Sequence, residues 1–343
     1  MIPATIDNRN STDISDAYQM PNSIWIDVRC PREFSKGHFT KAINIPLFSD
    51  SQHEKIGQTY KKTGQESATE MGLKYASKSS TDILKQISNL NSKNIIIYCA
   101  RGGMRSKGFQ LLLDNAGHHS FRIERGYKSI RAHTLDSYKS KREVVIIAGS
   151  TGTGKTDLLH QMKKNGYNVI DLEHLANHRG SAFGDLGLSE QSTQQQFEND
   201  LSSCWLDTDE NKPVFIESES RRIGRVTIPN DIWTQMLNGL YLKIDMNINR
   251  RIKNLIKDYG HHSKNNLVTR IHRISKKLGG QKTKIAIDLI EKNNLTKLCK
   301  LLLDNYYDKM YDTAYENRES KKKIIPVVDE TNQQIIKNVL NEV

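Results

Sequence analysis

A cysteine stands directly after a short apolar run, with Cys99 following Ile95–Tyr98. The chain then passes through Arg101 and two glycines to Arg105, and a helix is predicted over 106–115. Backbone N–H groups and the dipole at the start of a helix favour the thiolate, the nucleophilic form of cysteine. Arginine guanidinium groups bind oxyanions through paired hydrogen bonds. We therefore predict that this segment, residues 99–105, is a catalytic thiol loop formed by Cys99, Arg101 and Arg105.

A second loop follows the apolar run Val144–Ala148, and it reads Gly-Ser-Thr-Gly-Thr-Gly-Lys-Thr over residues 149–156. This spacing, between a strand and a helix, is the P-loop pattern. Glycines let successive N–H groups turn toward phosphate oxygens, a lysine neutralises their charge, and the final hydroxyl can ligate Mg²⁺. The predicted phosphate-binding residues are Gly149, Gly152, Gly154, Lys155 and Thr156, with Thr156 as the candidate Mg²⁺ ligand.

Two further groups are candidates for the same phosphate site. Glu217 ends a predicted strand over 213–217, where an acidic group could lie near the metal, although an exposed strand-end carboxylate is the alternative. Arg221 is one of three arginines in the run 218–225, which directly follows Glu217, and we include it among the phosphate-binding residues. Arg250 and Arg251 follow the next strand, and either arginine set could instead face solvent or RNA.

The elements that must position these loops alternate between strand and helix, which predicts an α/β fold with parallel sheets. Residues 1–137 form one such domain, 138–250 a P-loop NTPase-like domain, and 251–343 a basic, mainly helical region. A polar segment over 133–141 is expected to be a linker. The predicted strands lie at 23–29, 95–98, 121–123, 144–148, 168–171, 213–217 and 240–245.

Composition excludes several classes of protein. No apolar run approaches the roughly 18–20 residues that a membrane helix needs, and the first 22 residues do not resemble a secretion signal. The four cysteines lack zinc-like spacing, which favours a cytoplasmic chain with reduced thiols. No tightly bound cofactor and no membrane partner are indicated, and self-association stays open.

Basic charge is concentrated toward the end of the chain. The whole chain carries 51 Lys and Arg against 39 Asp and Glu, a formal charge of +12. From residue 243 onward the counts are 21 and 12, a net of +9. Such asymmetry indicates a polyanionic partner such as nucleic acid, with solvated lysine-rich helices as the alternative. Tyr306, Tyr307 and Tyr311 are candidates for base stacking, although their helical spacing favours core packing.

The first domain resembles the rhodanese family. The shared pattern comprises the opening strand and turn, then the cysteine and its closing arginine: Asp27-Val28-Arg29, Glu33-Phe34, Gly37-His38, Ala42–Pro46, Tyr98-Cys99 and Arg105. Common sulfurtransferases place four residues between this cysteine and arginine, whereas the present loop has five. The longer loop resembles that of rhodanese-like phosphatases and makes room for a tetrahedral phosphorus ligand.

A rhodanese module followed by a P-loop module, with the additional runs 179–184 and 216–221, resembles the tRNA 2-selenouridine synthase family. The resemblance implies a selenotransferase that replaces the sulfur of wobble 2-thiouridine in tRNA with selenium from selenophosphate. It also implies transfer of a geranyl group from geranyl diphosphate to that sulfur. On this interpretation the thiol loop handles selenophosphate, the P-loop holds the diphosphate, or ATP if it is a nucleotide site, and the basic helices hold tRNA.

Three other interpretations stay open at this point. The chain could be a P-loop ATPase or kinase with a regulatory rhodanese domain, which would bind ATP tightly and tolerate replacement of Cys99. It could be a rhodanese-like phosphatase, which leaves the P-loop without a purpose. A non-catalytic RNA-binding protein would use the basic region but would need neither loop.

Overall fold

The computed structural model describes residues 10–90, 94–181, 183–308, 316 and 319–343. The chain forms two compact units. Unit 1 comprises residues 1–137 together with 198–203, and unit 2 comprises residues 138–197 and 204–343. Within the described residues, no helix has the length and apolar character needed to cross a membrane.

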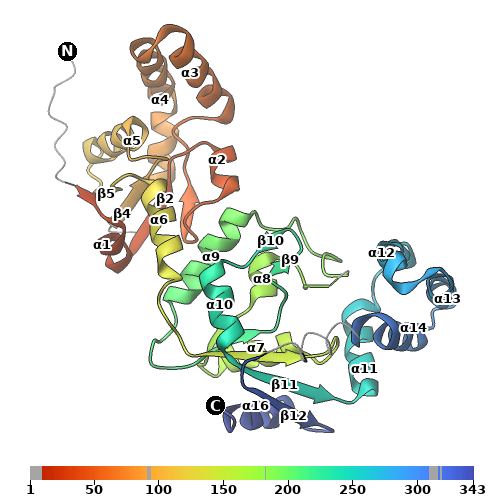
Figure 1. Cartoon of the computed structure of the whole chain (residues 1–343). Coiled ribbons are helices and arrows are strands. Elements are labelled where there is room, and N and C mark those ends of the chain that lie inside the picture. The colour runs from red at the N-terminus through yellow and green to blue at the C-terminus, as the bar shows by residue number, and fades with distance from the viewer. Residues whose placement is uncertain (1–9, 91–93, 182, 309–315, 317–318) are drawn as a thin grey trace. The chain divides into compact units, whose positions relative to one another are not determined.

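Unit 1 is built on a five-stranded parallel sheet (Figure 1). Its central strand, β4 (Asn94–Tyr98), pairs with β2 (Ser23–Asp27) on one side and β5 (Ser120–Ile123) on the other. The outer strands are β3 (Ala42–Asn44) and β1 (Ser11–Thr12). Helices cover both faces of a parallel sheet, so its strands are apolar throughout. This explains why Ile95–Tyr98 is entirely buried, and Cys99 follows at the carboxyl end of the strand.

Among the described residues of unit 1, six helices accompany this sheet: α1 (Ile14–Gln19), α2 (Pro31–Lys36), α3 (Asp50–Thr63), α4 (Gln65–Ser88), α5 (Met104–Asn115) and α6 (Tyr127–Ser137). Helices α3 and α4 pack side by side as a hairpin. The predicted linker over 133–141 is wrong for its first five residues, because α6 continues to Ser137. Buried Ile130, Thr134 and Ser137 recur at helical spacing, a pattern hidden by the polar side chains of the last two.

Unit 2 has a second five-stranded parallel sheet, ordered β12-β11-β6-β8-β7. Strand β6 (Val144–Gly149) is central and lies between β11 (Leu240–Met246) and β8 (Val214–Glu217). The outer strands are β7 (Asn168–Ile170) and β12 (Lys322–Val327). The P-loop leads from β6 into α7 (Lys155–Lys164), and the parallel α/β fold predicted for both units is therefore confirmed.

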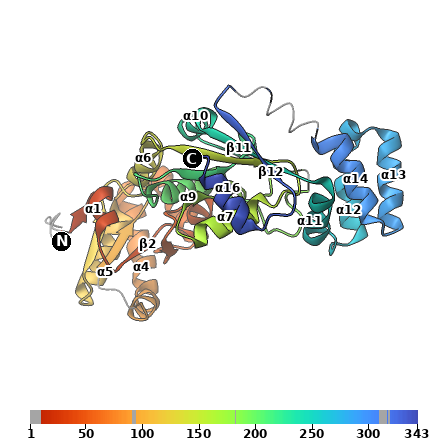
Figure 2. The same ribbon diagram turned by 90° about the horizontal axis from the view of Figure 1, so that it is seen from below.

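The remaining elements of unit 2 surround this sheet. They are α8 (Leu172–Ala176), α9 (Gln194–Leu206), the β9 (Arg222–Ile223) and β10 (Val226–Thr227) hairpin, and α10 (Asn230–Asn238). The middle of α9, residues 198–203, groups with unit 1. Helices α11 (Ile248–Tyr259), α12 (Lys264–Leu278), α13 (Gly280–Glu291) and α14 (Leu295–Leu302), followed by the π-helical turn η1 (Leu303–Tyr307), gather as a helical group (Figures 1 and 2).

The expectation of a mainly helical region over 251–343 misses one strand. β12 pairs with β11, and the final helix α16 (Asn332–Leu340) packs on β12 and α7. The strand begins with Lys322 and Lys323, directly after Lys321, and it contains Pro326; these features obscure a strand but are typical of a sheet edge. The end of the chain therefore completes the core of the P-loop sheet.

We expect Ile335→Ala to destabilise unit 2 by about 3 kcal/mol, because Ile335 is 2% exposed in the core between α16 and the sheet. Val328→Ala is the control, since Val328 is 65% exposed just beyond β12 and its loss should change stability by less than about 0.5 kcal/mol. Urea unfolding of both variants gives the comparison. Equal midpoints for the two would contradict the placement of α16.

Candidate functional site

The thiol loop joins β4 to α5, and it is held by the start of α6. The N–H of Tyr127 donates to the carbonyl oxygen of Cys99 at 2.8 Å, and the N–H of Lys128 donates to that of Ala100 at 3.2 Å. The Cys99 Sγ lies 3.2 Å from the hydroxyl oxygen of Ser106, in the first turn of α5. Cys99 is only 3% exposed. The thiol is therefore fixed at the start of a helix, as the sequence predicts.

Gly126 makes this close packing of α6 on the loop feasible. Its φ is +59°, and a Cβ at this position would lie 2.1 Å from the carbonyl oxygen of Cys99. Any other residue would force the loop and the start of α6 apart. Gly126 is thus part of the site through its lack of a side chain, a role that the sequence alone does not reveal.

Arg105 is engaged by a carboxylate. Its guanidinium donates to the two oxygens of Glu33 at 2.5 and 3.2 Å. Burial alone raises the pKa of Glu33, but the hydrogen bonds and charge of Arg105 outweigh it and lower the pKa to about 2. Arg101 is exposed. The structure thus brings Arg105 beside the thiol loop with Glu33 as its partner, whereas Arg101 faces solvent.

Cys30 and His53 lie next to the same carboxylate. The Cys30 Sγ is 3.2 Å from Glu33 Oε2, and His53 Nε2 is 3.7 Å from it. Burial, together with the neighbouring acidic groups, raises the pKa of Cys30 to about 11. Its thiol is therefore neutral near pH 7 and serves as a hydrogen-bond donor to Glu33.

The P-loop in unit 2 has the conformation its glycines allow, with φ of +86° at Gly152 and +74° at Gly154. The ammonium group of Lys155 donates to the carbonyl oxygen of Gly149 at 2.8 Å. Helix α11 holds the loop from one side through Arg251 and Asn254, which donate to the carbonyl oxygens of Thr151 and Gly152 at 2.9 and 2.8 Å. Arg251 is therefore a support of the loop, and it also pairs with Asp308 at 2.5 Å.

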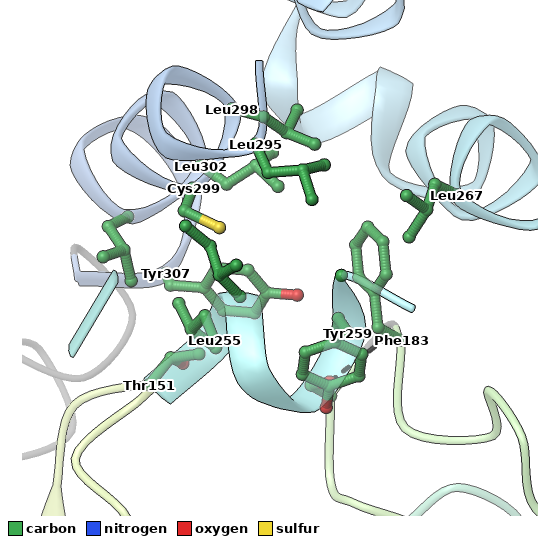
Figure 3. Close-up of a pocket in the computed structure, with 14 residues that line it drawn as sticks. Thr151, Phe183, Leu255, Tyr259, Leu267, Leu295, Leu298, Cys299, Leu302 and Tyr307 are labelled. Carbon is green, nitrogen blue, oxygen red and sulfur yellow. Dashed lines mark hydrogen bonds between the residues drawn. The ribbon is translucent and has the colours of Figure 1, made fainter. Parts of the chain in front are cut away.

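An apolar cavity adjoins the P-loop and is defined here as the tail cavity (Figure 3). Leu295, Leu298 and Leu302 of α14 form one side, and Phe183 and Leu267 form the other. The space between these residues is about 560 Å³ with the part open to solvent included. Its other lining residues are Thr151, Ser181, Leu255, Ile256, Tyr259, Gly260, Cys299, Leu303 and Tyr307.

The tail cavity adjoins a second space, defined here as the P-loop pocket, which is lined by residues 151–157 together with Glu173, Arg179, Ser181, Leu255, Asp258 and Tyr259. Thr151, Ser181, Leu255 and Tyr259 line both spaces. The P-loop side offers N–H groups, Lys155 and Thr156, whereas the tail cavity offers hydrocarbon. One ligand spanning both would carry a phosphorylated head and an apolar body.

Comparisons with known proteins agree with both halves of the chain. The family model of the tRNA 2-selenouridine synthase AAA domain matches residues 142–342, and that of the rhodanese-like domain matches residues 11–133. This chain belongs to the tRNA 2-selenouridine synthase family. The family named from the sequence motifs is thereby confirmed.

Individual relatives carry the same name. A tRNA 2-selenouridine synthase of Shewanella frigidimarina is 33% identical, over 88% of this chain and 91% of that protein. One of Nitrosomonas europaea is 37% identical, over 68% of this chain and 63% of that protein. A solved structure with a different name, described as the N-terminal domain of a putative ATP/GTP binding protein from Clostridium difficile 630, is 38% identical, covers 36% of this chain and 98% of its own length, and has a TM-score of 0.36.

Glu217, the acidic residue at the end of β8, lies in a buried environment and not at an exposed strand end. Glu217 is fully buried, so the interpretation as an exposed group is wrong. One of its oxygens accepts the N–H of Glu173 at 2.6 Å, and Oε2 has no hydrogen-bond partner in the part of the chain that the structure describes. Burial and the charges of Glu173 and Asp171 raise the pKa of Glu217 well above its usual range.

Glu173, which the sequence analysis did not single out, lies closer to the phosphate site. It lines the P-loop pocket together with Lys155 and Thr156, whereas Glu217 does not. Burial, and after it the charge of Glu219, raises the pKa of Glu173 to about 8. Its position two residues after Asp171, just past the end of β7, is the signal that could have identified it. The hydroxyl of Thr156 and this carboxyl group are oxygen donors of the kind that Mg²⁺ prefers.

Arg221 does not line the P-loop pocket, which is instead lined by Arg179. The Arg221 guanidinium is exposed and lies 3.4 Å from the side-chain oxygen of Asn230. Tyr307 is 8% exposed and packs in the core of the helical group, with Tyr306 against it. These two tyrosines are core residues in this structure, and Tyr311 lies outside the described residues.

The ion pair of Glu33 predicts a pH-dependent stability of unit 1. Because the pKa of Glu33 falls from 4.5 to about 2 on folding, its contribution is complete above pH 4.5 and is lost as pH falls toward 2. Glu33→Gln should therefore destabilise unit 1 by about 2–3 kcal/mol at pH 7, and by progressively less below pH 4.5.

Hydrogen exchange of peptides from β2 and β4 during urea titration, from pH 7 down to pH 3, measures this difference. Glu66→Gln is the control, since Glu66 is an exposed residue in the first turn of α4. If the loss of unfolding free energy caused by Glu33→Gln stays constant over this pH range, the assigned ion pair is contradicted.

Proposed function

We propose that this chain catalyses the tRNA 2-selenouridine synthase reaction through two successive steps. The sulfur of wobble 2-thiouridine is first alkylated with geranyl diphosphate, and the alkylated sulfur is then replaced by selenium from selenophosphate. The observation that carries the proposal is the tail cavity, because it adjoins the P-loop through shared walls. A ligand that has a diphosphate group but no apolar part would leave that apolar space without a purpose.

In the first step the P-loop holds the diphosphate while the tail cavity holds the geranyl chain. The sulfur attacks the allylic carbon, the carbon–oxygen bond breaks, the diphosphate leaves with the electron pair, and the uridine loses its N3 proton. The N–H groups of Gly152 and Gly154 and the ammonium group of Lys155 stabilise the charge on the leaving group. Mg²⁺ held by Thr156 and Glu173 would supply further neutralising charge.

In the second step the selenium of selenophosphate attacks C2 of the geranylated base. The C2–Se bond forms, the C2–S bond breaks, and geranylthiolate leaves and takes up a proton. Water then cleaves the phosphorus–selenium bond and releases phosphate. Cys99 positions the selenium for this attack, and Arg101 and Arg105 hold the phosphate half. Binding of that anion requires Arg105 to share or exchange its present partner Glu33.

The tRNA backbone binds to the basic helices that follow β11, where cationic residues are concentrated. Counterion release makes such binding steeply dependent on salt. The wobble base must leave its stack to reach either loop, as single-stranded bases do in other RNA-binding proteins.

A P-loop ATPase or kinase is the second candidate, and it rests on Glu217 at the carboxyl end of the strand beside β6. The lining of the tail cavity opposes it. Leucines, Phe183 and Ile256 provide no hydrogen-bonding groups to distinguish a nucleobase, whereas they match a hydrocarbon chain. Geranyl diphosphate should therefore bind at least 10-fold more tightly than ATP.

We expect Lys155→Ala and Cys99→Ala to separate the two steps. The Lys155 variant should lose geranylation by more than 100-fold, because it lacks the cation that stabilises the leaving group. The Cys99 variant should keep geranylation and tRNA binding but lose selenation. Mass analysis of tRNA nucleosides, after incubation with geranyl diphosphate alone or together with selenophosphate, measures both products.

Lys164→Ala and Cys204→Ala are the matched controls, since Lys164 is exposed at the end of α7 and Cys204 lies in α9, away from both loops in sequence. Selenation by Cys99→Ala at the wild-type rate would disprove the role of the thiol. Loss of ATP hydrolysis in Lys155→Ala with geranylation unchanged would favour the ATPase.

Cys299→Phe tests the tail cavity itself. Cys299 lines the cavity from α14, and a phenyl group there would occupy space needed by the chain (Figure 3). We expect the KM for geranyl diphosphate to rise at least 10-fold, while inhibition by inorganic diphosphate stays unchanged because the P-loop is intact. Weaker inhibition by diphosphate as well would show a collapsed site, and an unchanged KM would place the tail elsewhere.

A further inference from the structure

Unit 1 contains an apolar groove that the steps above do not use, defined here as the α3–α5 groove. It lies between the α3–α4 hairpin and α5, and its volume is about 1140 Å³ with the space open to solvent included. The lining residues are Leu47, Phe48, Ile56, Tyr60, Gln65, Ala68, Thr69, Gly72, Leu73, Ala76, Met104, Arg105, Gly108 and Leu111.

Large apolar side chains in this groove are exposed to water. Tyr60, Leu73, Met104 and Leu111 are 58%, 55%, 58% and 49% exposed, and they come from three different helices. A soluble protein seldom gathers such side chains around one hollow unless something apolar binds there. Phe48 and Ala68, which also line the groove, are buried, and Ile56 is half-buried.

The groove begins at the thiol loop. Met104 and Arg105, the first two residues of α5, lie within it, and the sulfur of Met104 approaches the hydroxyl of Thr69 at 4.0 Å from across the groove. Arg105 is the one charged residue among those that line it in the described part of the chain. From Gln65 to Ala76 the groove follows about 16 Å of α4, at 1.5 Å per residue.

We propose that the α3–α5 groove binds the hydrocarbon tail of the alkylated uridine while the C2 atom of that base reaches the thiol loop. This rests on the proposed function, because it takes the prenylated tRNA as the substrate of the second step. The carbon–sulfur bond to be broken then lies at the mouth of the groove, and the tail departs along it as geranylthiol once C2–Se has formed.

The shape and charge of the groove favour a tail over a protein partner. A protein interface has a polar rim with hydrogen bonds around its apolar centre. Here the polar lining is limited to Gln65, Thr69, the Tyr60 hydroxyl and Arg105, the last of which is paired with Glu33 beside the thiol loop. A hydrocarbon tail needs no hydrogen bonds, and its one polar end would lie at the reacting atoms.

Gly108 allows the groove to be filled without disturbing the fold. It lies in α5 without a positive φ, and no atom would lie within 4 Å of a Cβ added there. Gly57 in α3 has the same properties but does not line the groove. Since glycine is a poor helix former, a side chain at either position should leave its helix at least as stable. Gly108→Phe and Gly57→Phe are therefore matched variants.

The experiment supplies tRNA carrying S-geranyl-2-thiouridine or S-methyl-2-thiouridine, with selenophosphate, and measures 2-selenouridine by mass analysis. The wild type and Gly57→Phe should prefer the geranylated tRNA at least 10-fold in kcat/KM. Gly108→Phe should lose this preference, through a higher KM for the geranylated tRNA, and should retain activity on the methylated tRNA. Geranyl transfer to unmodified 2-thiouridine should be equal in all three proteins.

Preference for the geranylated tRNA retained in Gly108→Phe would overturn the proposal. Light scattering tests whether the groove is instead an interface between copies of the chain. If the wild type is a dimer, if only Gly108→Phe converts it to a monomer, and if the preference for geranylated tRNA persists, the proposal is also overturned. If the wild type does not selenate geranylated tRNA at all, the proposed function is refuted. If the wild type prefers geranylated tRNA and Gly108→Phe prefers it equally, only the role of the groove is refuted.

Discussion

A buried parallel strand ends where its neighbours no longer pair its backbone, and both candidate sites are built at such an end. Strand β4 leads into the thiol loop and α5, and β6 leads into the P-loop and α7. In each case the next helix presents N–H groups to the loop, which favours anions there. Both loops therefore lie where an α/β sheet is suited to bind anions, at the carboxyl ends of its strands. They differ in what each adds, a thiol in one unit and a lysine in the other.

The P-loop depends on a second constraint, the support given by α11. Arg251 donates to the carbonyl oxygen of Thr151 and pairs with Asp308, while Asn254 donates to that of Gly152. Arg251 is buried whereas Asp308 is partly exposed, so loss of Asp308 would leave a buried guanidinium without this partner and weaken the support of the loop. The same helix supplies Leu255 and Tyr259 to the shared walls of the tail cavity. Displacement of α11 would therefore change the phosphate cradle and the apolar space together.

Much of this could be predicted from local sequence, and the rest depended on long-range contacts. The strands before Cys99 and Gly149, the helices after them and the P-loop geometry follow from short apolar runs and glycine spacing. The lysine-rich edge strand β12 could not be recognised because its partner is about eighty residues away. For the same reason the pairing of Arg105 with Glu33, the replacement of Arg221 by Arg179 in the pocket, and the leucines of the tail cavity appeared only once the chain was folded.

The two apolar spaces give the proposed sequence of steps a physical logic. A sulfur on C2 is a poor leaving group as sulfide, whereas the alkylated sulfur departs as a thiolate. An alkyl group as small as methyl would suffice for that purpose, so the chemistry alone does not explain a long tail. Burial of apolar surface does explain it, at about 25 cal/mol per Å² removed from water. In the proposed sequence of steps, a tail held first in the tail cavity of unit 2 and then in the α3–α5 groove of unit 1 would mark the tRNA that has completed the first step, whereas an unmodified base has no tail for the groove to bind.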